Sequence, residues 1–372
     1  MQFNDLSEQW EIIKDDVMPR WESIMKKSCF INGPDVEIFE SNFSDYIGTR
    51  YACGTSNGTD AIKLCVEALE LRGSVGVFIP ANTFIATILG VEMAFGHDNP
   101  NIEYHLVDCD RFYQMDLTIL ERILNECRSR WDHCIILPVH LYGNCVDMVQ
   151  VMSLSEKHNC YVIEDCSQAH GTTLMNGRRV GSFGHMSAFS LYPGKNLGCA
   201  GDGGVITTND KDFFESLKLL QNWGAKEKYY YDRKGYNNRL DTLQAVIVDE
   251  KLKHLDEWNS KRNQVAGWYD QTINSDLYVT PEKSPSCKTH TYHIYNVRTY
   301  RRDVVIKSLE GKNLPYGIHY PVPIELTEVY KNQFDLNPKT VGYCGQLLSL
   351  PMHPFLSQEE VEMVSEVLNH AL

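Results

Sequence analysis

Hydrophobic positions switch between two spacings along the first two thirds of the chain. Where they recur every three or four residues, they mark one face of a helix. This spacing predicts helices over Leu6–Lys27, Val36–Tyr46, Asp60–Leu71, Leu117–Arg128 and Val149–Lys157. Short apolar or β-branched runs lie between them, at Ser74–Ile79, Glu103–Val107, Cys134–Pro138, Tyr161–Glu164 and Met186–Ser190. These runs do not alternate with polar residues, so they predict strands buried on both faces, as in a mostly parallel α/β sheet.

The pattern changes after about Gly235. Helical spacing over Leu240–His254 runs on into Trp258–Ile273, and His293–Tyr300 has the pattern of a strand. Ser357 with Glu360 three residues later predicts a capping box at the start of a last helix, Ser357–Leu372. We therefore expect a large α/β domain over residues 1–250 and a smaller α+β domain over residues 251–372.

Composition narrows the possible partners. The chain has 372 residues, with 35 Lys+Arg against 49 Asp+Glu, and a net charge of −14. This argues against broad nucleic-acid binding. Its 12 cysteines include no CxxC pair, and no apolar run approaches the length of a membrane span. The amino terminus lacks the basic-then-apolar pattern of a secretory signal. We expect a reduced cytoplasmic protein with no membrane partner and no metal.

Two polar segments next to predicted helices and strands suggest a ligand site. Gly54–Thr59 precedes a helix, where free backbone N–H groups suit a phosphate, although an ordinary tight turn has the same composition. Asp165 follows a buried strand, at the edge where open α/β sheets bind ligands. Its carboxylate can pair with a protonated ring nitrogen or, equally, cap a helix.

Lys195 is the candidate nucleophile. It follows the strand that ends at Ser190 and lies among small and apolar residues, so desolvation would favour its neutral amine. A snorkelling surface lysine is the alternative. Together, a phosphate-binding turn, an acid for a ring nitrogen and an amine for an aldehyde are what a pyridoxal 5′-phosphate enzyme must supply.

The chain resembles the DegT/DnrJ/EryC1/StrS family of nucleotide-sugar aminotransferases, which have the aspartate-aminotransferase-like fold (fold type I). The resemblance extends from about Asn32 to Pro354. It rests on eight segments in order: GTSNGTDAI, IPANTFIAT, VHLYGN, IEDCSQAHG, SLYPGKNLG, GDGG, GYNNRLDTLQA and GIHYPVPIEL.

The resemblance implies a role for each candidate residue. Lys195 would form a Schiff base with pyridoxal 5′-phosphate and later move the proton, and Asp165 would pair with the ring nitrogen. The remaining cofactor contacts would be Gly58, Thr59 and Ser190 at the phosphate, Phe84 on the ring face and Gln168 near the phenolic oxygen. Asn237, with Arg239 close by, would reach the cofactor of the partner subunit in a homodimer with shared active sites.

The resemblance also implies the substrates. Glutamate would donate the amino group to a nucleotide-linked keto-6-deoxyhexose. The segments around Lys195 and Gly317–Pro323 resemble members that aminate C3 of dTDP-sugars, with Tyr192, His319 and Tyr320 as substrate contacts. Members that aminate C4 tend to have GEGG where this chain has Gly201–Gly204 (GDGG), so the sequence favours C3, with C4 amination as the alternative. Glu325 departs from the family, which often has His there.

Other classes fit the sequence less well. A nicotinamide oxidoreductase would need GxGxxG after the first strand, and a dehydratase of this fold usually has His in place of Lys195. A non-catalytic relative would be expected to lose Lys195 or Asp165. The segment Lys226–Arg239 has five basic and two acidic residues, so Lys228 and its neighbours are candidates to bind the diphosphate across the dimer.

Overall fold

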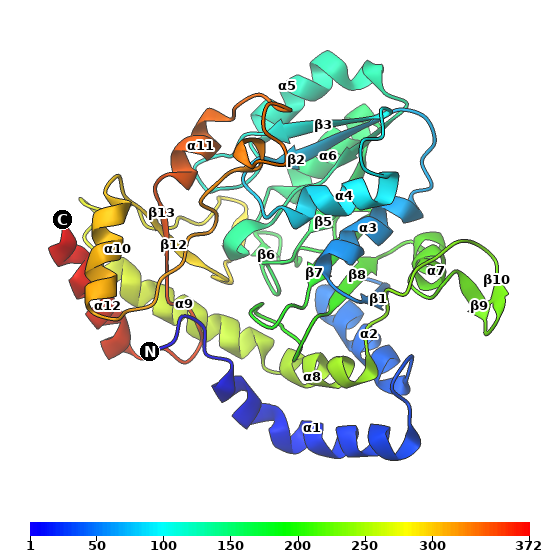
Figure 1. Ribbon diagram of the computed structural model, residues 1–372, viewed down its shortest axis with the longest axis horizontal. Helices are drawn as coiled ribbons and strands as arrows, with labels where there is room; N and C mark the ends of the chain where they lie inside the picture. Colours follow the sequence, from blue (N-terminus) through cyan, green and yellow to red (C-terminus); the bar gives the residue numbers. More distant parts are fainter.

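A seven-stranded sheet forms the centre of the computed structural model, which describes residues 1–372 (Figure 1). Its strands are β1 (Tyr51–Thr55), β2 (Val75–Pro80), β3 (Ile102–Val107), β4 (His133–Ile136), β5 (Tyr161–Asp165), β7 (Met186–Ser190) and β8 (Gly204–Thr208). The strand order is β1-β8-β7-β5-β4-β2-β3. Only β8 runs against its neighbours, β7 and β1. The mostly parallel α/β sheet expected from the sequence is confirmed.

Helices cover both faces of this sheet. One face packs on α2 (Pro34–Ile47), α5 (Leu117–Cys127), α6 (Met148–His158) and α8 (Thr242–Leu252). The other packs on α3 (Gly58–Ala68), α4 (Ala86–Phe95) and α7 (Lys211–Leu220). In β2, Phe78 belongs to the first core, and Val77 and Ile79 belong to the second. Successive side chains of a strand point to opposite faces of the sheet, so consecutive apolar residues make both faces apolar.

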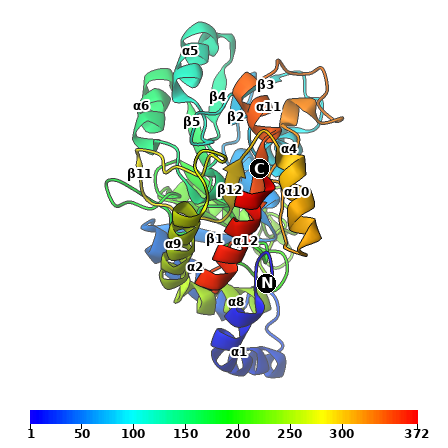
Figure 2. The ribbon, with the colours of Figure 1, turned by 90° about the vertical axis from the view of Figure 1, so that its left-hand side faces the viewer.

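The C-terminal part has its own core around a two-stranded antiparallel sheet, β12 (Tyr295–Arg298) with β13 (Leu347–Leu350). The helices α9 (Leu255–Thr272), α10 (Arg302–Gly311) and α12 (Gln358–Ala371) pack around it (Figure 2). The capping box between Ser357 and Glu360 is confirmed. The division of the chain near residue 250 stays a prediction.

The amino-terminal residues connect these two parts. Helix α1 (Ser7–Lys27) packs on α8 through Ile13 and Val17, while Phe3 O accepts a hydrogen bond from Met352 N at 3.1 Å.

No helix has the length and apolar character needed to cross a membrane. The short elements are η1 (Arg128–Arg130), η2 (Leu141–Gly143), η3 (Ile324–Leu326), α11 (Pro338–Cys344), β6 (Thr173–Leu174), β9 (Ala225–Glu227), β10 (Tyr230–Tyr231) and β11 (Cys287–Thr289).

Candidate active site

A cavity of about 760 Å³ opens at the carboxyl ends of the parallel strands. Phe84 follows β2, Val139 follows β4, Gln168 follows β5 and Lys195 follows β7, and all four line the cavity. The first residue of α3, Gly58, lines it as well. The carboxyl edge is where open α/β sheets bind ligands, so the fold itself places these side chains around one space.

Most of the predicted site residues meet in this cavity: Gly58, Thr59, Phe84, Asp165, Gln168, Ser190, Tyr192, Lys195, His319 and Tyr320. Lys228, Asn237 and Arg239 do not line it. Lys228 and Asn237 are exposed, and Arg239 Nη1 donates to Asn222 Oδ1 at 2.9 Å. These three residues therefore reach no ligand in the cavity of their own chain, and their role toward a partner subunit stays a prediction.

Asp165 is held in one orientation. It is 4% exposed, and its Oδ2 accepts a hydrogen bond from Thr87 Oγ1 at 2.9 Å. Its Oδ1 accepts from Ser167 N at 3.1 Å. A buried carboxylate with fixed donors can stabilise a cation placed against it in the cavity. Thr87, in the first turn of α4, has no sequence signal beyond being a polar residue in an apolar helix.

Lys195 is an amine in a low-dielectric environment. Its backbone N–H donates to Tyr192 O at 2.8 Å in the turn after β7. Burial lowers the pKa of Lys195 to about 8, although the Asp165 carboxylate acts in the opposite direction. The desolvation argument made from the sequence therefore agrees with the structure. A lysine with this pKa has a neutral, nucleophilic fraction near neutral pH.

Gly58, Thr59 and Ser190 form what we call the Gly58 cup. Helix α3 begins at Gly58, and the side chain of Asn57 caps it by accepting from Asp60 N at 2.8 Å. The first N–H groups of a helix lack intrahelical acceptors and suit an anion. A Cβ on residue 58 would lie 2.6 Å from Ser190 Cβ, so only glycine leaves the cup open. Cup, amine and acid fit the phosphate, aldehyde and ring nitrogen of pyridoxal 5′-phosphate.

Asn238 braces this cup, a role that no sequence motif indicated. Its Nδ2 donates to Asp60 Oδ2 at 2.7 Å and to Ser56 Oγ at 3.0 Å. Asn237 next to it is exposed. Of the two asparagines of the segment GYNNRLD, Asn238 is therefore the one that contacts the cup, which spacing alone does not show.

Gln168 and Tyr320 form a donor pair on the opposite wall. Gln168 Oε1 accepts from Tyr142 N and its Nε2 donates to Tyr320 OH, both at 2.8 Å. Burial raises the pKa of Tyr320 above its usual value, so the phenol keeps its proton. Because the Tyr320 oxygen already accepts from Gln168, its own hydrogen is free for a ligand. The Phe84 ring lies 5.5 Å from the Tyr320 ring.

His319 presents an acceptor to the cavity. The Ser349 hydroxyl donates to Asn296 Oδ1, so Ser349 Oγ accepts the hydrogen of His319 Nδ1 at 2.8 Å. Nε2 of His319 then has a lone pair. Burial lowers the pKa of His319 to about 4, and the Lys195 charge adds to this, so the ring stays neutral.

The extreme amino terminus also lines the cavity, which no sequence signal indicated. The Phe3 ring stacks on the His319 ring at a centroid distance of 6.0 Å. Asn4 Nδ2 donates to Gly194 O, next to Lys195, at 3.1 Å. These residues are about 190 positions from Lys195 in the chain, so only the tertiary fold brings them to the site.

The two positions that bear on the choice of substrate lie in different places. Glu325 is 2% exposed, accepts from Asn337 N at 3.1 Å and does not line the cavity. Asp202, in the glycine-rich loop before β8, does line it. Of the two positions, only Asp202 can therefore bear directly on which ligand fits.

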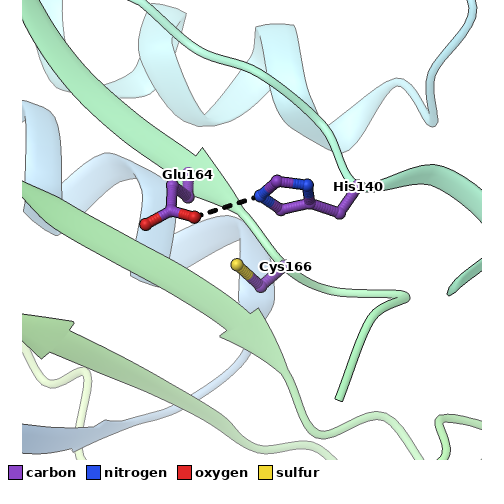
Figure 3. A group of neighbouring side chains, drawn as sticks. All are labelled: His140, Glu164 and Cys166. Carbon is purple, nitrogen blue, oxygen red and sulfur yellow. Dashed lines mark hydrogen bonds and ion pairs between the residues drawn. The ribbon is translucent and has the colours of Figure 1, made fainter. Parts of the chain in front are cut away.

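One cluster outside the cavity has the residue types of a metal site: His140, Glu164 and Cys166 (Figure 3). The lone pairs of His140 and Glu164 are already in use. His140 Nδ1 accepts from Val146 N at 3.2 Å, so Nε2 has the hydrogen and donates to Glu164 at 3.1 Å. Other donors complete the shell of the carboxylate, namely the N–H groups of Gly181, Phe183 and Gly184 and the hydroxyl of Ser187. Burial alone would raise the pKa of Glu164, but His140 and the N–H groups of Gly184 and Gly181 lower it. His140 and Glu164 therefore form a hydrogen-bonded brace.

Comparison with known proteins identifies the family to which this fold belongs. Residues 11–369 match the model of the DegT/DnrJ/EryC1/StrS aminotransferase family. A dTDP-3-amino-3,4,6-trideoxy-α-D-glucose transaminase of Streptomyces venezuelae is 33% identical over 98% of this chain and 94% of its own. A dTDP-3-amino-3,6-dideoxy-α-D-galactopyranose transaminase of Aneurinibacillus thermoaerophilus is 37% identical over 95% of this chain and 94% of its own.

A solved structure agrees with these relatives. The crystal structure of S. venezuelae DesV in complex with a ketimine intermediate superposes with a TM-score of 0.92 at 31% identity, covering 100% of this chain and 98% of that one. The chain belongs to the DegT/DnrJ/EryC1/StrS aminotransferase family and has the aspartate-aminotransferase-like fold of type I. It is therefore a transaminase, as expected from the sequence.

Proposed function

We propose that the protein transfers the amino group of glutamate to C3 of a dTDP-linked 3-keto-6-deoxyhexose, with pyridoxal 5′-phosphate as cofactor. The observation that supports this most strongly is the convergence of Lys195, Asp165 and the Gly58 cup at one end of the sheet. The names of the two relatives, both dTDP-3-amino sugar transaminases, support the position and the nucleotide.

Each residue then has a defined task. When bound, the cofactor supplies an aldehyde to hold the amino group and a conjugated ring to withdraw electrons from the reacting carbon. Gly58 and Thr59 would bind the phosphate through backbone N–H groups, and Ser190 would bind it through its hydroxyl. The negative charge of Asp165, held in place by Thr87 and Ser167, would favour a proton on the ring nitrogen.

Lys195 moves the proton. With its pKa lowered to about 8, Nζ can accept the proton from the α-carbon of glutamate near neutral pH, and it would deliver that proton to the cofactor carbon that keeps the amino group. In the second half of the reaction the same amine works in reverse on C3 of the sugar. Phe84 lines the cavity, and Tyr320 OH is a donor for an oxygen on the ligand.

We further propose that the enzyme is a cytoplasmic homodimer. The exposure of Asn237 and Lys228, away from the cavity of their own chain, supports a role in the site of the partner. Arg233 is less available for this, because its Nη1 already pairs with Glu70 at 2.6 Å.

The test is a pair of half-reactions followed by absorbance. Glutamate should convert the pyridoxal form of the enzyme to the pyridoxamine form, and a dTDP-3-keto-6-deoxyhexose should convert it back. Turnover of a dTDP-4-keto-6-deoxyhexose in preference to the 3-keto sugar would favour C4 amination instead. A protein that takes up no pyridoxal 5′-phosphate would refute the proposal.

A further inference from the structure

His293 is a second cavity histidine whose task the family resemblance did not indicate. It lies just before β12 and lines the cavity. Its backbone N–H donates to Tyr142 O at 2.9 Å, and its ring Nδ1 lies 3.0 Å from Asn196 Oδ1. Asn196 follows Lys195 directly in the chain. The imidazole is therefore held both by its own backbone and by the neighbour of the candidate catalytic lysine.

A chain of hydrogen bonds determines which nitrogen of His293 has the proton. Asn259 Nδ2 donates to the His170 carbonyl at 2.8 Å, so Asn259 Oδ1 is an acceptor. It accepts from Asn196 Nδ2 at 2.9 Å, and the same Nδ2 donates to the Thr291 carbonyl at 2.9 Å. Asn196 Oδ1 must then accept, so Nδ1 of His293 is the donor. The two backbone carbonyls cannot donate, so they fix the direction of every hydrogen bond in this chain.

The consequence is a lone pair on Nε2 of His293. Both asparagines are buried, with 2% exposure for Asn196 and 3% for Asn259, so water cannot easily reverse the chain. Burial holds the pKa of His293 well below its usual value, and the Lys195 charge acts in the same direction. The ring is neutral, and Nε2 has no partner within the chain.

A neutral acceptor discriminates between the two substrates. The carboxylates of glutamate are themselves acceptors, and its amino group, which is its donor, is engaged at the cofactor, so glutamate gains nothing from a lone pair. A sugar brings hydroxyl donors, and a buried hydroxyl without a partner is costly. We propose that Nε2 of His293 accepts a hydrogen bond from a hydroxyl of the keto sugar and so orients the sugar toward Lys195. This inference rests on the function proposed above.

Two substitutions separate this role from a structural one. His293→Asn places an amide nitrogen near the position of Nδ1, so it keeps the bond to Asn196 and loses the cavity acceptor. His293→Gln reaches the position of Nε2, so it keeps the cavity acceptor and loses the bond to Asn196. If the ring only braces the fold, His293→Gln is the more damaging change. If Nε2 binds the sugar, His293→Asn is the more damaging change.

The measurement is calorimetric titration of dTDP-3-amino-3,6-dideoxy-α-D-galactopyranose into the pyridoxamine phosphate form of the enzyme, in which no amino group can be exchanged. We expect His293→Asn to weaken binding by about tenfold or more, and His293→Gln by about threefold or less. The exposed residue His370 supplies the control, His370→Asn. Thermal melts and the cofactor spectrum show whether each variant is folded and loaded.

Other outcomes overturn the inference. Equal affinities of the two variants, or the reverse order, would leave His293 with a bracing role only. A rise in the KM for glutamate as large as the loss of sugar affinity would place His293 on the donor side. If the wild-type enzyme completes the glutamate half-reaction but does not bind the sugar nucleotide, the inference and the proposed sugar substrate both fail. Absence of the glutamate half-reaction refutes the proposed function separately.

Discussion

The hydroxyl of Thr87 donates a hydrogen bond of 2.9 Å to Oδ2 of Asp165, so a side chain of α4 fixes the carboxylate at the end of β5. Thr87 Oγ1 in turn lies 2.8 Å from Thr83 Oγ1. Since the hydrogen of Thr87 goes to Asp165, Thr83 is the donor in the second bond. The acid expected to face the ring nitrogen thus depends on two hydroxyls that follow β2.

Thr87→Val should weaken the site without removing it. Loss of one donor destabilises the ionised form of Asp165 by about 1–2 kcal/mol, which predicts a roughly tenfold lower kcat and weaker cofactor retention. Thr87→Ser keeps the hydroxyl and should restore both. Stopped-flow absorbance of the glutamate half-reaction measures the rate, and gel filtration followed by cofactor assay measures retention. Equal rates in the valine and serine variants would contradict the account.

Lys195→Ala should abolish transamination while leaving cofactor binding detectable. The cup and Asp165 remain, so pyridoxal 5′-phosphate still binds, but without a covalent bond to the enzyme. The wild-type protein should keep its cofactor after borohydride reduction and denaturation, and Lys195→Ala should release it. Measurable steady-state turnover in Lys195→Ala would rule out the role assigned to this residue.

The low pKa of Lys195 predicts a pH effect on the stability of the apoenzyme. The folded pKa is about 8 and the ordinary value is 10.5, so the unfolded chain binds more protons between these pH values. The free energy of unfolding should therefore rise with pH across this window. Below pH 8 the penalty of the buried charge is present in full.

The substitution Lys195→Met isolates the contribution of Lys195 to the pH dependence of stability. The variant apoenzyme should be more stable than wild type by about 3 kcal/mol well below pH 8, and this advantage should shrink toward pH 10. Urea denaturation at pH 7, 8.5 and 10 measures it. Lys251, whose pKa burial also lowers to about 8, is present in both proteins and cancels in the difference. A pH-independent difference would argue against a desolvated Lys195.

Gly58→Ala tests the Gly58 cup. The new Cβ would lie 2.6 Å from Ser190 Cβ, so the cup must either widen or exclude the phosphate. We expect a loss of pyridoxal 5′-phosphate affinity of about a hundredfold or more, since a charged phosphate loses several hydrogen bonds. Gly267→Ala, in α9 with no atom near the new Cβ, is the matched control. Pyridoxal without its phosphate should bind both variants alike if the cup recognises phosphate.

Asn237 tests the shared active site. Asn237→Ala should lower the activity strongly although the residue is exposed and outside the cavity of its own chain. Mixing this variant with Lys195→Ala and allowing subunits to exchange should restore about a quarter of the wild-type activity, because half of the dimers are hybrids with one intact site. No recovery in a preparation shown by sedimentation to contain hybrids would contradict a contribution from the partner.

The sequence predicted the part of the fold with clear periodicity and missed parts where local composition misleads. Strand β1 contains Gly54 and Thr55, which have the composition of a turn, and β8 follows the glycine-rich loop Gly201–Gly203. Both strands lie next to each other at one edge of the sheet and form through the antiparallel pairing of β8, a long-range interaction that no local window contains.

The candidate site likewise contains residues that the sequence predicts and residues that it does not. Residues at strand ends, such as Asp165 and Lys195, were predictable because topology places strand ends together. Phe3 and His293 were not, since their positions depend on tertiary packing and on the hydrogen bonds of Asn196. Sequence motifs also cannot show that Asp202 lines the cavity while Glu325 does not.

The most direct test of the proposed function is the structure of the product. The enzyme, loaded with pyridoxal 5′-phosphate, is incubated with glutamate and an equilibrating mixture of dTDP-3-keto- and dTDP-4-keto-6-deoxyhexose, and the product is examined by two-dimensional NMR. The account predicts an amino group at C3 of the sugar and formation of 2-oxoglutarate in equal amount. An amino group at C4, or no amino sugar while glutamate still converts the cofactor, would contradict it.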